Sequence, residues 1–187
     1  MCVSAEFCES QLQLLFTLLE KSPSEVIRAN IVISLGDMAI CFSSLIDENI
    51  SHLYKRLSDP SLFVRSNTLM VLSHLILNGM IKVKGQISEM AKCLNEPDAK
   101  ISELAKLFFA EMAAKDNAIY NNLPDIISGL SSGDNALSEE AFRKVIDYIF
   151  SFIQKDKQTE NLVEKLCNRM GQTEVCFFLI IIELLTK

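Results

Sequence analysis

Few residues in this chain have the types and spacings that catalysis requires. The two histidines, His52 and His74, lie singly in helical patterns and lack the partner spacing of a zinc site. Glu139 and Glu140 are adjacent, so on a helix they point to different sides, which suits solvation better than acid–base catalysis. The phosphate-binding patterns GxxxxGK(S/T) and GxGxxG do not occur. We therefore predict a protein that is not an enzyme and needs no cofactor or metal.

The cysteines also indicate no chemistry. The six cysteines include no CxxC pair, and we expect the three that fall within helical patterns to be small core residues in a reducing compartment: Cys41, Cys93 and Cys167. The first ten residues carry two glutamates and no positive charge, which is not the pattern of a signal peptide. We expect a soluble intracellular protein.

A short connector is the first of two candidate sites that remain. Lys82 and Lys84 lie two residues apart and are followed by Gly85. Lysine ammonium groups in a loop move freely, and glycine permits backbone conformations that are closed to other residues. On spacing alone the segment is either an ordinary solvated turn or a binding loop.

The second candidate is a pair of opposite charges, Asp59 and Arg65, at a predicted turn and the first turn of the following helix. In stacked helical repeats such a pair can bridge adjacent turns. We favour this structural role in the repeat turn over a binding role.

The helix that must position this pair is the stretch 59–78. We expect Asp59 to cap the helix and Pro60 to occupy its first turn, where a backbone N–H would be unpaired anyway. Apolar residues then follow at three- and four-residue steps, as a half-buried helix requires: Val64, Thr68, Val71, Leu72, Leu75 and Ile76. A shorter apolar stripe precedes the turn: Ile50, Leu53, Tyr54 and Leu57. The unit is helix, tight turn, helix.

This unit recurs with a period of 37 residues. The prolines at 23, 60 and 97 keep that spacing, and four columns of residues share it: Ile27, Val64 and Ile101; Ile31, Thr68, Ala105 and Phe142; Leu35, Leu72, Phe109 and Ile146; Met38, Leu75, Met112 and Ile149. In the fourth copy Asp134 stands where the proline would be. A single helix pair cannot bury its apolar faces, so neighbouring copies must stack. The pattern predicts an all-α protein, an α-solenoid.

The expected organisation is a solenoid over residues 10–170, with four repeats and the first helix of a fifth, then a divergent apolar tail over 171–187. We predict helices at 10–20, 23–43, 50–57, 60–77, 86–94, 97–115, 123–130, 138–152 and 158–170. Ser22 and Glu25 fit a capping box. The stretch 175–185 is too short to span a bilayer. It is either the second helix of the fifth repeat or an apolar end that is left exposed, and we favour a helix that packs on the fourth repeat.

Composition agrees with a folded helical chain, because 49% of the residues are apolar and there are only six glycines and four prolines. The net charge is −6, yet residues 51–115 carry nine basic and six acidic side chains. Only this segment could bind an anionic partner, and the excess is small. We expect at most weak, non-specific, salt-dependent binding to DNA.

Several segments of the chain resemble a known family. Residues 36–40, 52–77, 80–98, 104–128 and 155–167 closely resemble the C-terminal HEAT-repeat region of the D2-type, non-SMC subunits of condensin I. The resemblance runs from about residue 30 to residue 170, and the connector is among its more specific parts. It implies repeats of the HEAT type.

The resemblance also implies a function. A member of this family would help SMC ATPases to compact mitotic chromosomes, with the SMC ATPase head and the kleisin subunit as partners and no membrane or small-molecule substrate. It would be found in the nucleus, on mitotic chromosomes and in the cytoplasm. The Lys-Gly loop of the family is associated with docking on an SMC head, which points to Lys84 and Gly85, with Lys82 as a neighbour.

The family's chains are far longer, and after residue 170 they continue with charged residues rather than an apolar run. We therefore expect a truncated or alternative product. The D3-type subunits of condensin II share the repeat pattern, but the KVKGQ and LPDIIS segments favour the D2 type. A generic HEAT-repeat adaptor, such as a transport or phosphatase scaffold without chromosome function, is the alternative from a different class.

Overall fold

The computed structural model describes residues 4–83, 85–115, 117–132 and 136–153 of the chain. Every regular element in these residues is a helix, as the sequence predicted. The chain divides into two compact units, Met1–Val83 and Lys84–Lys187. The predicted helix at 158–170 and the apolar tail lie outside the described residues.

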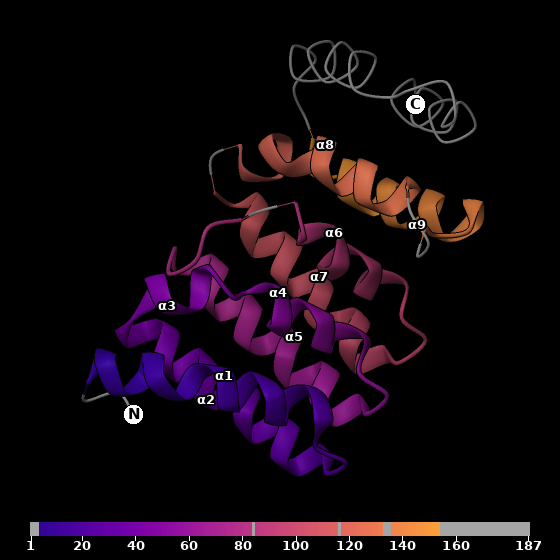
Figure 1. Ribbon diagram of the computed structural model, residues 1–187. Helices are drawn as coiled ribbons and strands as arrows, with labels where there is room; N and C mark the ends of the chain where they lie inside the picture. The colour runs from indigo at the N-terminus through magenta and orange to yellow at the C-terminus, as the bar shows by residue number, and fades with distance from the viewer. Residues whose placement is uncertain (1–3, 84, 116, 133–135, 154–187) are drawn as a thin grey trace. The chain divides into compact units, whose positions relative to one another are not determined.

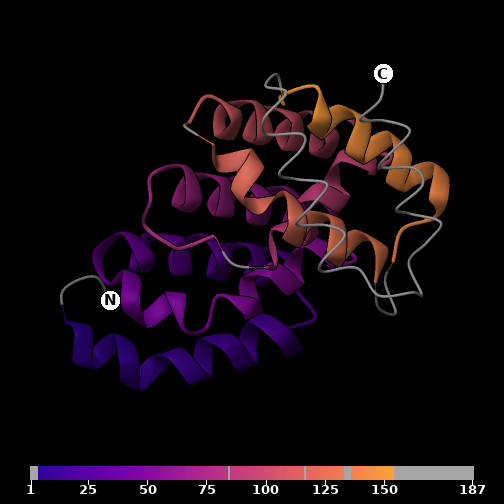
Figure 2. The same cartoon turned by 90° about the horizontal axis from the view of Figure 1, so that it is seen from above.

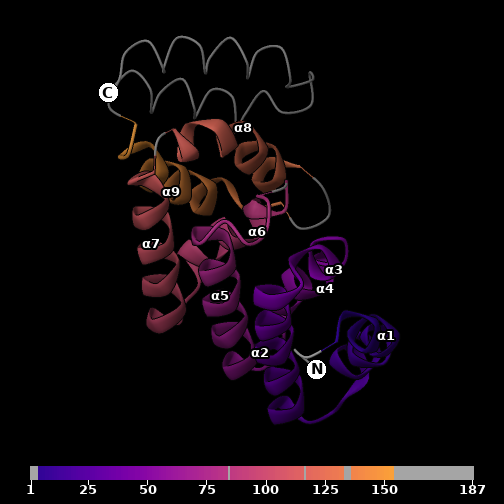
Figure 3. The same cartoon turned by 90° about the vertical axis from the view of Figure 1, so that its left-hand side faces the viewer.

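The first unit is built on three long helices, of which the middle one packs against the other two. Its elements are α1 (Ala5–Lys21), α2 (Glu25–Cys41), α3 (Ser43–Asp47), α4 (Ser51–Tyr54), the 3-10 helix η1 (Lys55–Ser58) and α5 (Leu62–Leu77). Figures 1 and 3 show α2 between α1 and α5, and both neighbours contact it. The four residues of the predicted stripe at 50–57 are all buried. Two helix–turn–helix pairs therefore form this unit.

The second unit repeats this organisation. Its elements are α6 (Ile87–Lys92), the 3-10 helix η2 (Cys93–Asn95), α7 (Ala99–Ala113), α8 (Ala118–Ser131) and α9 (Glu139–Phe150). Helix α8 packs against α6 and also contacts α7 and α9, and Figure 2 shows the salmon and orange helices of this unit from above. Its core contains the largest buried side chains of the unit: Phe108, Phe109 and Phe142.

The 37-residue columns are confirmed by burial. The columns that begin at Ile31, Leu35 and Met38 are buried in all four copies. Ile27 is the exception, because it is 47% exposed whereas Val64 and Ile101 in its column are 0% and 1% exposed. Ile27 lies in the first repeat, where no earlier helix pair of the described residues covers that face of α2.

The expected helix starts were placed too early. The N-cap residue directly follows each repeat proline, and these caps are Ser24, Ser61 and Asp98. The first helical residue therefore lies two positions after the proline. The predicted cap residue Asp59 is therefore outside α5, and Ser22 ends α1 rather than starting α2. The Ser24 hydroxyl and the Asp98 carboxylate accept the N–H three residues on, as N-caps do.

Four further expectations are corrected by the structure. Helix α1 begins at Ala5 rather than residue 10, and α8 begins at Ala118 with Pro124 inside it. The short predicted helices end in 3-10 turns. Cys93 is buried as expected, whereas Cys41 is exposed because it is the last residue of α2 and lies off the buried face. Cys167 is outside the described residues.

Close packing of α2 on α5 depends on a glycine. A Cβ atom at Gly36 would lie 2.7 Å from Cγ1 of Val71, which is closer than real Cβ contacts allow. We predict that Gly36→Ala destabilises the protein by about 1–3 kcal/mol, because overpacking of a well-packed interface has this cost. The expected gain from higher helix propensity is smaller, about 1 kcal/mol.

Urea denaturation of the single and double variants checks this prediction. Val71→Ala removes the methyl group that the new Cβ would meet, so the double variant Gly36→Ala, Val71→Ala should lose less stability than the sum of the single losses. If Gly36→Ala alone is more stable than the wild type, α2 and α5 do not approach each other as closely at Gly36 as the structure shows.

Candidate functional site

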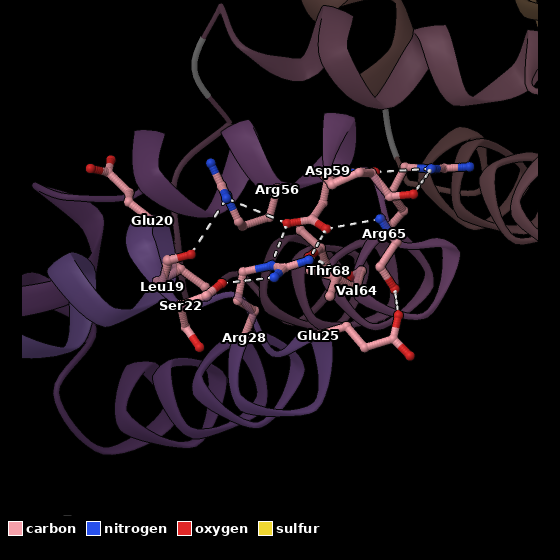
Figure 4. A network of polar contacts seen from close by, with 12 residues as sticks. Leu19, Glu20, Ser22, Glu25, Arg28, Arg56, Asp59, Val64, Arg65 and Thr68 are labelled. Atoms are coloured by element: carbon pink, nitrogen blue, oxygen red, sulfur yellow. Dashed lines mark hydrogen bonds and ion pairs between the residues drawn. The ribbon is translucent and has the colours of Figure 1, made fainter.

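The most extensive polar network in the described residues surrounds Asp59 in the first unit. Asp59 is 2% exposed, and Arg28 of α2 donates two hydrogen bonds to its carboxylate, from Nε to Oδ2 at 2.9 Å and from Nη2 to Oδ1 at 2.8 Å. Figure 4 shows the two side chains facing each other. Paired, parallel hydrogen bonds of this kind are the strongest arginine–carboxylate geometry. The pair ties the first repeat to the turn of the second.

Two more groups donate to the same carboxylate. The backbone N–H of Ser61 lies 3.0 Å from Oδ1, and Nη1 of Arg56 lies 3.4 Å from Oδ2. Burial by itself raises the pKa of Asp59, but the hydrogen bonds from Arg28 and the Ser61 N–H, with the positive charges of Arg28 and Arg56, hold it below its ordinary value. Hydrogen bonding to Asp59 raises the pKa of Arg28. Asp59 is therefore a buried carboxylate held in its charged form.

Arg65 belongs to this network but does not reach the carboxylate. Its Nη1 donates to the backbone oxygen of Asp59 at 2.9 Å. Arg28 makes the equivalent contact one repeat earlier, from Nη1 to the backbone oxygen of Ser22 at 2.8 Å. The structure thus brings Asp59 and Arg65 together through the main chain. The repeat-turn role assigned to this pair from the sequence stays a prediction.

Sequence reasoning missed Arg28, although it is the main partner of Asp59. The pair is separated by 31 residues, so no local spacing connects them. A signal was present, because Arg28 is the only basic residue of α2 and lies in an otherwise apolar stretch. A long charged side chain with a buried guanidinium requires an acidic partner.

The network offers no reactive group. Its carboxylate is bound by two arginines and a backbone N–H, and the arginines stay protonated in proteins. Ser61 donates its hydroxyl hydrogen bond to Glu25 of α2. These contacts hold helices in place, and the arrangement is suited to positioning the repeat turn rather than to bond cleavage.

The connector follows the end of α5. Gly79 has a φ of 67°, and the N–H groups of Gly79 and Met80 donate to the carbonyls of Ile76 and Leu75, which is the Schellman pattern that ends helices. Ile81 is buried and Lys82 is exposed. Gly85 is exposed too, and a Cβ atom built there meets nothing within 4 Å. Lys84 lies outside the described residues.

The two histidines have ordinary surroundings. The His52 ring stacks on Phe16 with 4.5 Å between centroids, and its Nδ1 lies 3.0 Å from the Glu20 carboxylate. The hydrogen bond with His52 lowers the pKa of Glu20. His74 lies beside Asn78 at the end of α5. Within the described ranges no group of three potential metal ligands occurs.

None of the described helices is both long and apolar enough to cross a membrane. In the described residues, the fold is a series of helix–turn–helix pairs with a 37-residue period, and its main polar site is a buried inter-repeat ion pair. These features define an all-α protein of the HEAT-type α-solenoid class.

The family follows from comparison with known sequences. A family model described as non-SMC mitotic condensation complex subunit 1 matches residues 26–182. Because the match covers most of the chain, this protein belongs to that family, as the resemblance in the sequence indicated.

Individual relatives agree. The chain is 51% identical over 174 residues to condensin complex subunit 1 of Saccharomyces cerevisiae, covering 93% of this chain and 15% of the relative. It is 54% identical over 167 residues to condensin complex subunit 1 of Homo sapiens, covering 89% and 12%. The chain thus spans only 12–15% of the length of these relatives. Among solved structures, a designed armadillo repeat protein in complex with the peptide (KR)4 matches 98% of this chain and 87% of its own at a TM-score of 0.48 and 16% identity.

Proposed function

We propose that this chain is a non-catalytic HEAT-repeat segment of a condensin subunit that supports mitotic chromosome condensation by binding partner subunits. The partners of this proposal are an SMC ATPase head and a kleisin subunit. The site of action is then the mitotic chromosome, with the nucleus and cytoplasm as compartments. Direct contact with DNA is at most weak and non-specific, since the local positive excess over residues 51–115 is only three charges.

One observation carries the proposal. More than half of the aligned residues are identical to condensin complex subunit 1 of both a yeast and a human. We place partner binding in the connector because Lys82, Lys84 and Gly85 match the Lys-Gly loop that the family resemblance associates with docking on an SMC head.

The alternative is a HEAT-repeat adaptor without chromosome function. The repeat architecture suits it equally well, because solenoids of this class present extended surfaces to many kinds of partner. The family match favours condensin. Recovery of transport or phosphatase cargo instead of condensin subunits would favour the adaptor.

Lys84→Glu is the variant that tests the connector. Reversing a charge at an interface that complements lysine costs several kcal/mol, and about 2.7 kcal/mol is a hundredfold in affinity. We expect binding to an isolated SMC ATPase head to weaken by about a hundredfold or more. Gly85→Val should also weaken binding to the head, because valine restricts the backbone of the connector. The space around Gly85 is open, so the valine side chain should meet no clash that unfolds the protein.

Lys100→Glu is the matched control, since Lys100 is an exposed lysine on α7 of the same unit. Its binding should equal that of the wild type. Melting curves of all three variants should stay within about 0.5 kcal/mol of the wild type, as exposed substitutions usually do. Equal binding by Lys84→Glu, Gly85→Val and the wild type would make the connector an ordinary turn.

A further inference from the structure

A buried serine of α6 holds the end of the connector. Gly85 is the first described residue of the second unit, and its backbone oxygen accepts a hydrogen bond from the Ser88 hydroxyl, with 3.3 Å between Oγ and O. Ser88 is the second residue of α6 and is 4% exposed. A buried hydroxyl requires a partner, and here that partner is the main chain of the connector.

A glycine of α8 makes room for this serine. A Cβ atom at Gly129 would lie 2.3 Å from Oγ and 2.5 Å from Cβ of Ser88, and both distances are shorter than real Cβ contacts allow. Rotation of the Ser88 side chain could move Oγ away from such an atom but could not move Cβ. A larger residue at position 129 would therefore displace α6 from α8, because packed interiors transmit strain.

The two contacts connect α8 with the connector. Gly129 sets how closely α8 approaches Ser88, and Ser88 in turn binds the Gly85 carbonyl. Gly85 is exposed, and a Cβ atom built there meets nothing within 4 Å. Because the space around Gly85 is open, side-chain packing does not fix its position, whereas the hydrogen bond from Ser88 does.

From this geometry we propose that Ser88 and Gly129 are positioning residues of the connector. Ser88 holds the Gly85 carbonyl, and Gly129 keeps α6 close to α8, where Ser88 reaches that carbonyl. This inference rests on the proposed function, in which the connector docks on an SMC ATPase head. A connector that is already held in one conformation loses less conformational entropy on docking, so the same contacts give a tighter complex.

Brief digestion of the folded full chain with trypsin measures the hold on the connector without any partner. The fragment that begins at Gly85 is quantified by mass spectrometry and divided by the amount of cleavage after Lys100 in α7, so that global unfolding cancels. Ser88→Ala removes the hydroxyl and leaves the contact of α6 with α8 intact. Since cleavage follows local opening, this variant should raise the ratio about two- to tenfold, which is the effect of one hydrogen bond.

Ser102→Ala is the matched control, because the Ser102 hydroxyl also donates to a backbone oxygen of the same unit, that of Leu94 at 3.1 Å. Its cleavage ratio should equal that of the wild type. Gly129→Ala should raise the ratio and lower the melting temperature. The drop in melting temperature caused by Gly129→Ala should be smaller in a Ser88→Gly background, which lacks both atoms that the new Cβ would meet. An unchanged ratio in Ser88→Ala or in Gly129→Ala would overturn the proposal.

Binding to an isolated SMC ATPase head tests the consequence for docking. Ser88→Ala and Gly129→Ala should weaken binding about two- to tenfold, whereas Ser102→Ala should bind like the wild type. If Lys84→Glu weakens binding and Ser88→Ala does not, the positioning role is wrong and the docking role stands. If the cleavage ratio rises in Ser88→Ala while neither Ser88→Ala nor Lys84→Glu changes binding, the hold on the connector is confirmed and the docking role is wrong.

Discussion

Replacing Asp59 with alanine is expected to lower the free energy of unfolding by about 3–5 kcal/mol, which is the usual cost of removing one partner of a buried ion pair. The substitution leaves the Arg28 guanidinium, whose side chain is 10% exposed, without its carboxylate. It also removes the acceptor of the Ser61 N–H. Urea denaturation followed by circular dichroism measures the loss.

Two further variants separate the contribution of the ion pair to stability from the unspecific effect of a substitution. Glu9→Ala removes an exposed carboxylate of α1 and should change stability by less than about 0.5 kcal/mol. The double variant Arg28→Met, Asp59→Leu replaces both charges by apolar groups and should recover part of the loss, because no buried charge is left unpaired. Equal losses in Asp59→Ala and Glu9→Ala would show that the pair is not buried in solution.

The same pair predicts a pH dependence. Because the pKa of Asp59 is lowered in the folded protein, its contribution is present above the ordinary aspartate pKa of about 4 and is lost as the pH falls through the lower folded value. Arg28 stays charged throughout this range. Stability should therefore decline more steeply below about pH 4 in the wild type than in Asp59→Asn, and parallel profiles would contradict the direction of the shift.

Leu72→Asp is the second substitution with a large expected effect. Leu72 lies in the second half of α5 and is 0% exposed, and burying an unpaired carboxylate costs several kcal/mol. That cost is comparable with the whole stability of a small domain, about 5–15 kcal/mol. Since each repeat is stabilised mainly by its neighbours, we expect the cooperative melting of the first unit to disappear.

Met70→Asp is the matched control, because Met70 lies two residues earlier on the same helix and is 43% exposed. The same change of chemistry should there cost about 0.5 kcal/mol or less. A Leu72→Asp protein that melts like Met70→Asp would place Leu72 outside the core and make the repeat register wrong.

The repeat register could be predicted from the sequence because it depends on periodicity. Leu35, Leu72, Phe109 and Ile146 recur every 37 residues and are all fully buried, since stacking of identical units requires the same face in every copy. The ends of helices were less predictable. Proline at position 60 fits either the first helical turn or the residue before the cap, and only the main-chain geometry separates the two.

The candidate site could be predicted only in part. Asp59 and Arg65 were found because they lie close in sequence, whereas Arg28 reaches Asp59 from another repeat, and a single sequence carries no direct sign of that contact. Burial was also predicted wrongly at two positions, Ile27 and Cys41. Both lie in an apolar helical pattern, yet both are exposed, because burial depends on which neighbouring helix covers that face.

The measurement that tests the proposed function most directly is capture of partners from dividing cells. The tagged full chain is expressed in mitotic cells, and the proteins that co-purify with it are quantified by mass spectrometry against the Leu72→Asp variant. Membership in the condensin subunit family predicts that SMC and kleisin subunits are enriched at least about tenfold with the wild type. If the wild type and the variant capture these subunits equally, or if other cargo dominates, the proposed role in condensin is contradicted.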